Sequence, residues 1–419
     1  MKFKFLGGAR QVGRSAVLVE TDIRFLLDYG VKVEHGEGEN IFPEPFGDPV
    51  ELAVISHAHL DHSGFIPALF DTGKPRILGT PPSKALIELL LEDSIKLMEE
   101  LPYKLSSFKK SLRHFQPINF DETFYRGDTT FTLRYAGHIT GAAMIDVEYK
   151  NHRILYTGDF SWRETELHSK PDYPPDRDSI DILIIESTYA NRDHPPRKDL
   201  EKAFYEDVRS TYESGGHVLI PAFAVDRQHE IISVLRKYDR KNRLPIYMDG
   251  MSKKATKIMM RYPEYIKDFK TFKRRIESAT PVTSSRMRAR VLDEPCVIVS
   301  TAGMLSGGPA LYYILRLNPK SKVIFVGYCV EGTNGWYLQN KGVFFMEDGT
   351  EARVDLPVEY YDFSAHAGRS ELFEFVRGVN PEKVFVMHGD EDNAVDFADE
   401  LALEGFDAVA PKINDTFEI

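Results

Sequence analysis

The sequence contains little cysteine and no long hydrophobic run. Its two cysteines among 419 residues, Cys296 and Cys329, are too few for a disulfide framework and form no CxxC pair. No stretch approaches the ~18 apolar residues of a membrane span, and the first residues lack the apolar core of a signal peptide. We therefore expect a cytoplasmic protein with no membrane contact, in which both cysteines pack as small core residues.

The chain also lacks the excess of positive charge found in proteins that coat nucleic acid. Its formal net charge is −11, whereas unselective binding to nucleic acid depends on Lys and Arg side chains that neutralise phosphates. One segment, residues 267–290, is locally basic, with eight Lys or Arg against two acidic residues. The composition excludes a general nucleic-acid coat protein and leaves open an enzyme that binds nucleic acid in one groove.

Three histidines and one aspartate occupy six consecutive positions, from His57 to His62. The apolar run 52–55 before them predicts a buried strand, so we expect these side chains on the loop at its carboxyl end. With 13 histidines in the whole chain, chance clustering is improbable. Imidazole nitrogens and carboxylate oxygens suit zinc, and four such groups exceed the three protein ligands typical of one catalytic zinc. The segment predicts a site for two metal ions.

Single ligand-type residues follow other predicted strands in the first part of the chain. Asp28 is the last residue of a strand at 24–28, His138 follows one at 131–135, and Asp159 follows one at 153–156. Segments 65–70 and 83–100 show helical periodicity and are expected to cover one face of the sheet.

From about residue 191 the pattern changes to helices that alternate with strands, as in a parallel α/β unit. Helices are predicted at 198–213, 226–237, 252–262 and 309–317, and strands at 217–220, 245–248, 297–301 and 322–327. A strand at 354–361 and two further strand-end histidines, His366 and His388, suggest a return to the first domain. The predicted domains are therefore 1–190, 191–345 and 346–419, the middle one being an insertion.

This order of motifs resembles the β-CASP family of metallo-β-lactamase-fold ribonucleases over essentially the whole chain. The hexapeptide at 57–62 is typical of the metallo-β-lactamase superfamily, while Ser364-Ala365-His366-Ala367 and the glycine-rich segment 303–309 are most similar to archaeal nucleases related to the cleavage and polyadenylation specificity factor and lacking KH domains. The resemblance implies an α/β fold, in which a metallo-β-lactamase αββα sandwich carries an inserted parallel β-CASP domain.

The resemblance also implies two zinc ions per chain and a role for each site residue. The implied metal ligands are His57, His59 and His138 for one ion, Asp61, His62 and His388 for the other, and Asp159 for both. Asp61 also counts among the catalytic groups, and Asp28 would orient a ligand histidine. The resemblance assigns protonation of the leaving oxygen to His366, held by the carboxylate of Glu186.

Two segments of the inserted domain are candidates for substrate binding. Ser300, Thr301, Gly303 and Gly307 belong to a strand-to-helix turn that is either a tight turn or a cradle of backbone amides for phosphates. Arg286 and Arg290 are candidates for the groove between the domains, although charged runs are usually solvated faces.

The predicted function is that of a zinc-dependent ribonuclease in RNA processing or decay. We expect it to cut single-stranded RNA internally and to leave 5′-phosphate and 3′-hydroxyl ends, as the family does. A 5′-to-3′ exoribonuclease of the RNase J type and a non-catalytic RNA-binding scaffold subunit stay open as alternatives. Hydrolysis of small esters would not need so large an insertion. The sequence leaves open a homodimer and contacts with RNA-decay or transcription machinery.

Overall fold

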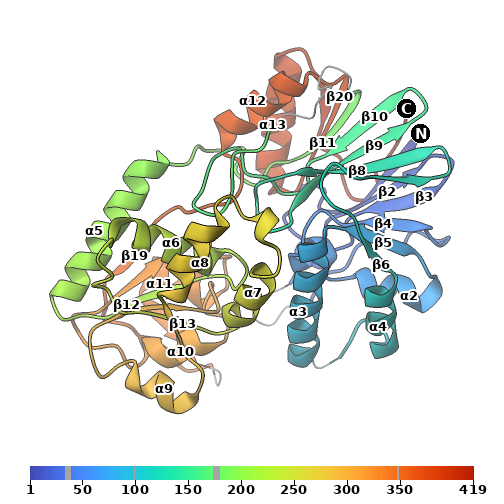
Figure 1. Cartoon of the computed structure of the whole chain (residues 1–419). Helices are drawn as coiled ribbons and strands as arrows, with labels where there is room; N and C mark the ends of the chain where they lie inside the picture. The colour runs from blue at the N-terminus through green and yellow to red at the C-terminus, as the bar shows by residue number, and fades with distance from the viewer. Residues whose placement is uncertain (34–38, 99, 173–179, 347–348) are drawn as a thin grey trace.

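The chain forms two lobes, which a computed structural model describes for residues 1–33, 39–98, 100–172, 180–346 and 349–419 (Figure 1). Both termini lie in the same lobe, which contains two seven-stranded sheets, and the middle of the chain forms the second lobe around a six-stranded sheet. The predicted α/β architecture, an αββα sandwich with an inserted parallel α/β unit, is confirmed.

The first lobe is a sandwich of two sheets that pack face to face. The first sheet contains β1 (Lys2–Gly7), β2 (Ala16–Glu20), β3 (Arg24–Leu27), β4 (Leu52–Val54), β5 (Arg76–Gly79), β6 (Phe115–Pro117) and β22 (Thr416–Glu418), in the order β22-β1-β2-β3-β4-β5-β6. The second contains β7 (Thr123–Arg126), β8 (Thr129–Tyr135), β9 (Ala143–Tyr149), β10 (His152–Tyr156), β11 (Ile182–Glu186), β20 (Lys383–Met387) and β21 (Asp407–Val409), in the order β21-β20-β11-β10-β9-β8-β7.

Aromatic rings fill the space between these two sheets. Phe25 on β3 meets Phe131 on β8 edge-on, with ring centroids 4.9 Å apart, and Phe5 meets Phe385 at 5.2 Å. All four side chains are fully buried. Burying one such side chain stabilises the folded state by about 1.5–3 kcal/mol. This interior fixes the two sheets against each other.

Helices cover the outer faces of the sandwich, with α3 (Pro81–Leu97) and α4 (Leu105–Arg113) on one side and α12 (Arg369–Val379) and α13 (Glu391–Leu403) on the other (Figure 1). The predicted helix at 83–100 begins two residues earlier, because Thr80 caps it by accepting from the Ser83 amide and a proline suits the first helical position. The predicted helix at 65–70 is a short 3-10 turn, Ile66–Ala68, followed by α2 (Leu69–Thr72). In the described part of the chain, no helix combines the length and apolar character that crossing a membrane requires.

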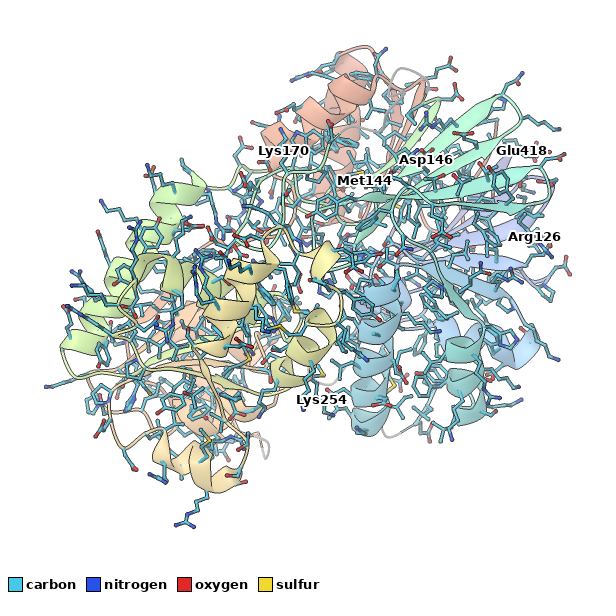
Figure 2. All side chains as sticks on the ribbon, viewed as in Figure 1. Arg126, Met144, Asp146, Lys170, Lys254 and Glu418 are labelled. Carbon is cyan, nitrogen blue, oxygen red and sulfur yellow. The ribbon has the colours of Figure 1, made fainter. Side chains whose placement is uncertain are left out.

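A buried charged pair lies on the second sheet. Asp146 of β9, labelled in Figure 2, accepts from Arg153 Nε at 2.9 Å and from Arg153 Nη2 at 2.7 Å, and Arg134 reaches the same carboxylate. Because Asp146 is almost fully buried, this pairing is needed to keep the charge in the interior.

The second lobe has an all-parallel sheet with helices packed around it. Its strands are β12 (Val218–Pro221), β13 (Ile246–Asp249), β14 (Thr280–Pro281), β15 (Val297–Ser300), β16 (Lys322–Phe325) and β19 (Val358–Tyr360), in the order β14-β13-β15-β12-β16-β19. Its helices are α5 (Arg197–Glu213), α6 (Arg227–Tyr238), α7 (Ser252–Met259), α8 (Phe269–Glu277), α9 (Ser285–Arg290), α10 (Pro309–Ile314) and α11 (Asn334–Lys341), and a 3-10 turn spans Pro263–Tyr265. The predicted alternation of helices and strands is present, with ends shifted by a few residues.

The strand pairing differs from the predicted domain boundary at residue 345. A small hairpin of β17 (Val343–Phe345) and β18 (Glu351–Arg353) follows α11, and β19 then pairs in parallel with β16. The sheet of the second lobe therefore extends to Tyr360. A short run such as 358–360 suits the edge of either sheet, and only the contacts of the folded chain decide which sheet it joins.

Candidate metal centre

The ends of several strands in the sandwich meet at one edge and bring the predicted ligands together. The loop after β4 leads into α1 (Leu60–Ser63), and together they carry the hexapeptide from His57 to His62. His138, Asp159 and His388 follow β8, β10 and β20, respectively. Strands β3, β4 and β5 are mutually parallel, as are β10, β11 and β20. Because the carboxyl ends of parallel strands meet at one edge, residues far apart in the sequence become neighbours.

One group of converging atoms contains three imidazoles and a carboxylate oxygen. The Nδ1 of His59 lies 3.2 Å from the Nε2 of His57 and 3.2 Å from the Nε2 of His138. Asp159 Oδ2 is 3.6 Å from His57 Nε2 and 3.7 Å from His138 Nε2. All four ligand atoms lie within 4.8 Å of one another, which is close enough for one cation to contact all of them.

A second group uses the other oxygen of the same carboxylate. Asp159 Oδ1 lies 3.3 Å from His62 Nε2 and 3.0 Å from His388 Nδ1. Asp61 Oδ2 completes the group, at 3.3 Å from His388 Nε2 and 3.7 Å from His62 Nε2. The two groups therefore share Asp159, one through each carboxylate oxygen.

The residues of both groups fit bound metal. Three atoms that face the centre, His62 Nε2, Asp159 Oδ1 and His388 Nε2, are buried and have no hydrogen-bond partner among the described residues, although such atoms normally have one. Burial and the neighbouring His62 hold the pKa of His57 well below its usual range, and burial with His366 does the same for the pKa of His138. The neutral imidazoles and the carboxylate of the first group form the donor set that zinc prefers. In the second group burial lowers the pKa values of His62 and His388, but Asp159 and Asp61 outweigh burial and raise them, so a cation there would displace protons.

Asp28 supports the centre from behind. Its Oδ2 lies 2.7 Å from His62 Nδ1 and accepts from Ser56 Oγ and from the Tyr156 hydroxyl, each at 2.7 Å, while its Oδ1 accepts from the Ser56 amide. The Ser56 hydroxyl is also 3.0 Å from His57 Nδ1. Asp28 was predicted from the sequence, but Ser56 and Tyr156 were not. Their positions offered a signal, since Tyr156 ends an apolar strand and Ser56 follows the apolar run 52–55.

His366 and Glu186 form a pair beside the first ligand group. His366 Nδ1 lies 3.0 and 2.9 Å from the two oxygens of Glu186, and Glu186 Oε1 also accepts from the Phe160 amide at 2.9 Å. The rings of His366 and His138 are 4.7 Å apart. Burial lowers the pKa of His366, but the Glu186 and Asp159 carboxylates together outweigh burial and raise it. Nε2 is left as the ring nitrogen that does not face Glu186.

A contact between the lobes lies next to the ligand loop and was missed from the sequence. Asp226, directly before α6, accepts from the Thr140 amide at 2.5 Å and the Thr140 hydroxyl at 2.9 Å, and its Oδ2 lies 2.7 Å from His168 Nε2. Thr140 is two positions after His138. The contact holds the inserted lobe against the centre, and no local pattern in the sequence indicates that these side chains meet.

The proposed substrate residues separate into two sets. Ser300 ends β15, and Thr301, Gly303 and Gly307 form the turn that leads to α10. Gly303 is packed so closely that a β-carbon there would lie 3.1 Å from the Phe223 nitrogen. Arg286 and Arg290 are exposed on α9, which Figure 1 places at the end of the inserted lobe away from the sandwich. The structure does not bring these two arginines to the metal cluster.

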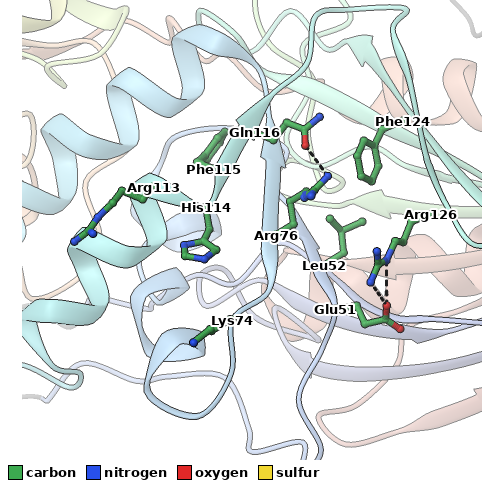
Figure 3. Close-up of a pocket in the computed structure, with 10 residues that line it drawn as sticks. All are labelled: Glu51, Leu52, Lys74, Arg76, Arg113, His114, Phe115, Gln116, Phe124 and Arg126. Atoms are coloured by element: carbon green, nitrogen blue, oxygen red, sulfur yellow. Dashed lines mark hydrogen bonds and ion pairs between the residues drawn. The ribbon is translucent and has the colours of Figure 1, made fainter.

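The cavity drawn in Figure 3 does not belong to the metal centre. It measures about 400 Å³, and its lining includes Leu52, Arg76 and Phe115, the first residues of β4, β5 and β6. Across it, Arg126 donates to Glu51 at 2.7 Å. The cavity thus lies at the amino ends of these parallel strands, whereas the ligand loop follows their carboxyl ends.

Three family models match successive parts of the chain, which correspond mainly to the start of the sandwich, the inserted lobe and the end of the sandwich. The metallo-beta-lactamase superfamily model matches residues 16–213, the Beta-Casp domain model matches 228–338, and the model of the Zn-dependent metallo-hydrolase RNA specificity domain matches 351–411. The chain belongs to the β-CASP family of metallo-β-lactamase-fold ribonucleases and is a zinc-dependent metallohydrolase of that family. The predicted enzyme class is confirmed.

Relatives at full length support this membership. The chain is 38% identical to "Probable RNase MJ4" of Methanocaldococcus jannaschii over 100% of both chains, and 37% identical to "RNase aCSPSF2" of Saccharolobus solfataricus over 98% of this chain and 83% of that one. It is 35% identical to the transcription termination factor FttA of M. jannaschii over 95% of this chain and 68% of that one. A crystal structure of a protein of unknown function from Enterococcus faecalis V583 shares the fold, with a TM-score of 0.63 and 11% identity over 99% of each chain.

Proposed function

We propose that this protein cuts single-stranded RNA at internal phosphodiester bonds, with two zinc ions per chain, and leaves 5′-phosphate and 3′-hydroxyl ends. One observation carries the proposal. Two groups of ligand atoms share Asp159 through its separate oxygens, and the His366–Glu186 pair lies beside them. Such a pair of ligand groups suits hydrolysis of a phosphodiester, because metal held there would supply Lewis-acid chemistry to both the phosphoryl group and the attacking water.

Each residue near the centre has a proposed task. His57, His59 and His138 would hold one zinc, Asp61, His62 and His388 the other, and Asp159 both. Asp61 counts as catalytic because its carboxylate, with its side chain 30% exposed, lies on the side open to substrate. Zinc in these positions supplies Lewis-acid chemistry, which polarises phosphoryl oxygens and lowers the pKa of water. Asp28 fixes the ring of His62 through its Nδ1.

His366 is the proposed general acid. Glu186 accepts from Nδ1, so the protonated ring directs its Nε2–H away from Glu186, where it can protonate the leaving ribose oxygen. A carboxylate behind the imidazole fixes its orientation and stabilises its charged form, as this role requires. The partly exposed ring, with 20% of its side chain accessible, is reachable by substrate.

The strand-to-helix turn of the inserted lobe is the proposed contact for the RNA backbone near the cut. Ser300, Thr301, Gly303 and Gly307 lie at the carboxyl edge of the parallel sheet, where ligands of such sheets bind. Arg286 and Arg290, at the far end of this lobe, are proposed to meet only distant parts of a long RNA. Since relatives named transcription termination factor FttA cover 94–99% of this chain, we also propose the transcription machinery as a partner, with a homodimer as the alternative assembly.

One unstructured RNA labelled at either end tests the mode of cleavage. We expect internal fragments from a 5′-triphosphate substrate, with the same cut positions seen from both labels. Mononucleotides released only from 5′-monophosphate RNA would instead establish the RNase J type of exonuclease. RNA binding without cleavage by zinc-loaded protein would establish a scaffold subunit.

The His366→Ala variant is the matched control for contaminating nucleases. It should fold, retain zinc and lose cleavage, because the ring contributes a proton rather than a ligand. Full activity in this variant would contradict the assignment of the general acid.

A further inference from the structure

Exposed aromatic side chains concentrate at one place on this protein. Among the described residues, the aromatic side chains with the largest exposed fractions are Phe223, Tyr328, Tyr360 and Tyr125, at 40%, 55%, 37% and 70%. Three of the four lie in the inserted lobe: Phe223 is two residues after β12, Tyr328 is three residues after β16, and Tyr360 ends β19. Exposure of large apolar rings is unfavourable, so a cluster of them indicates a surface that binds something.

The three rings lie at the same edge of the sheet. Strands β12, β16 and β19 are consecutive in the sheet and mutually parallel, so their carboxyl ends point the same way. Neighbouring strands are about 5 Å apart, so Phe223, Tyr328 and Tyr360 come from three adjacent strands at one edge of the sheet. We call these three residues the aromatic edge.

The aromatic edge faces the metal centre. Burial raises the pKa of the Tyr328 hydroxyl, and the charge of Asp390, two residues after His388, raises it further. The Tyr360 hydroxyl lies 3.2 Å from Asp362 Oδ1, in the segment that leads to His366. Tyr360 therefore contacts the segment that leads to the proposed general acid, and Tyr328 follows the neighbouring strand on the same edge of the sheet.

Arg192 lies between the aromatic edge and His366, the proposed general acid. The guanidinium of Arg192 lies 4.8 Å above the ring of Tyr189 and 3.3 Å from Asp362, and its side chain is 44% exposed. The ring of Tyr189 is in turn 5.9 Å from the ring of His366. A positive group therefore lies between the aromatic edge and the reaction site, where a phosphate would pass.

Glycines keep the first ring accessible. Gly327, two residues after β16, is the residue beside the Phe223 ring, and a β-carbon there would lie 3.6 Å from Phe223 Cε2. No side chain at position 327 covers that part of the ring. Gly303 of the proposed backbone-binding turn packs against the Phe223 backbone. Phe223 thus combines an open ring with direct contact to the turn that we expect to meet the sugar-phosphate chain.

We propose that Phe223 and Tyr328, extended by Tyr360, stack against unpaired bases of the RNA strand next to the scissile phosphate. This inference rests on the proposed function and adds a base subsite to it. Bases stack on aromatic rings whatever their sequence, because every base has a flat π-face. A duplex does not offer its base faces in this way. The aromatic edge therefore selects unpaired RNA with little preference for sequence.

The test compares the double variant Phe223→Ala/Tyr328→Ala with wild type on two oligoribonucleotides. One is unstructured RNA, and the other is the same strand with abasic riboses at the positions flanking the mapped cut. Stacking contributes enough per base that we expect the double variant to raise KM for the ordinary strand about tenfold or more, with kcat little changed. On the abasic strand the two proteins should have the same KM.

Matched variants separate stacking from general damage. Tyr125→Ala removes the fourth exposed ring, on β7, and should leave KM unchanged. Phe223→Tyr and Tyr328→Phe keep a ring and should stay within about twofold of wild type. An unchanged KM in the double variant, or an equal rise on both strands, overturns the proposal.

A binding measurement distinguishes failure of the base subsite from failure of the proposed function. A strand with 2-aminopurine at the flanking positions is titrated with zinc-loaded protein. Quenching by wild type that is lost in the double variant supports stacking even if no RNA is cut, in which case only the proposed cleavage fails. Equal quenching by both proteins, or no binding by either, contradicts the base subsite.

Discussion

The imidazole rings of the metal centre are oriented by oxygen atoms on their outer sides. His62 contacts Asp28, His57 contacts Ser56, and His138 Nδ1 lies 2.9 Å from the Ala365 carbonyl. Each contact fixes which ring nitrogen is free to face the centre. The ligand set therefore depends on residues that would not themselves touch metal.

Asp28→Asn tests this dependence. An amide offers only one acceptor oxygen and turns an NH₂ group towards buried donors that the carboxylate now satisfies. We expect zinc affinity to fall about 10–100-fold, as measured by competition with a chromophoric chelator. Ser56→Ala, which removes one hydroxyl from the same network, should give a smaller loss. Wild-type affinity in Asp28→Asn would show that the His62 ring needs no such support.

Glu186→Gln tests the pair that includes the proposed general acid. Glutamine retains the shape and can still accept from the Phe160 amide, but it no longer stabilises a charged His366 ring. We expect kcat to fall about 100-fold or more, with KM and zinc content unchanged. Glu206→Gln, an exposed change on α5, is the control. A rise in KM at constant kcat would assign Glu186 to substrate binding instead.

At the scale of elements, the ends of the parallel strands in the inserted lobe carry buried charges that join it together. Asp249, at the end of β13, accepts from Arg288 Nε at 2.6 Å, from Lys253 Nζ at 3.1 Å and from the Tyr313 hydroxyl at 3.0 Å. Two arginines of the basic segment 267–290 form ion pairs with carboxylates of the protein itself. Arg288 pairs with Asp249, and Arg275 pairs with Glu166 at 2.5 Å.

Asp249 makes the stability of this lobe depend on pH. Burial raises the pKa of its carboxyl, but the Arg288 and Lys253 partners outweigh burial and lower it below 3.8. A carboxyl with a lowered pKa in the folded state contributes stability above its unfolded pKa, and this contribution is lost as the pH falls through the folded value. The difference in unfolding free energy between wild type and Asp249→Asn, from urea denaturation, should be largest near pH 7 and shrink below about pH 4. A constant difference would contradict this assignment.

Asp226→Asn tests the contact that holds the lobes together. Asparagine tolerates the positive φ of 59° at this position, so the change removes charge rather than backbone fit. Because Thr140 and His168 are left facing an amide, we expect a loss of about 1–3 kcal/mol in the free energy of unfolding. Asp199→Asn, in the first turn of α5, should change it by less than about 0.5 kcal/mol. Equal stability of both variants would remove Asp226 from the lobe interface.

At the scale of the whole molecule, the sequence predicts local chemistry better than long-range contacts. Clustered histidines after an apolar run predict a ligand loop, and alternating helix and strand patterns predict the inserted lobe. The order of apolar and polar residues does not show that 358–360 joins the sheet of the inserted lobe, because so short a strand would fit the edge of that sheet or of a sandwich sheet. It also does not show that Asp226 meets Thr140, since that contact depends on how two lobes pack. Arg286 and Arg290 were predicted from charge alone, which carries no information about position.

The arrangement of the two lobes explains the order of the ligands along the chain. Residues from His57 to His388 form one centre because both halves of the sandwich end their strands at the same edge, and the inserted lobe lies between those halves in the sequence and beside the centre in space (Figure 1). The metal cluster and the proposed RNA-binding edge thereby belong to different lobes of the molecule.

Metal content is the most direct test of this account. Protein purified without chelators after expression with added zinc is measured by inductively coupled plasma mass spectrometry against its amino-acid concentration. Two groups that share Asp159 predict two zinc ions per chain, and chelation should abolish RNA cleavage until zinc is restored. One ion or none per chain in fully zinc-loaded, folded protein would contradict the shared two-ion centre.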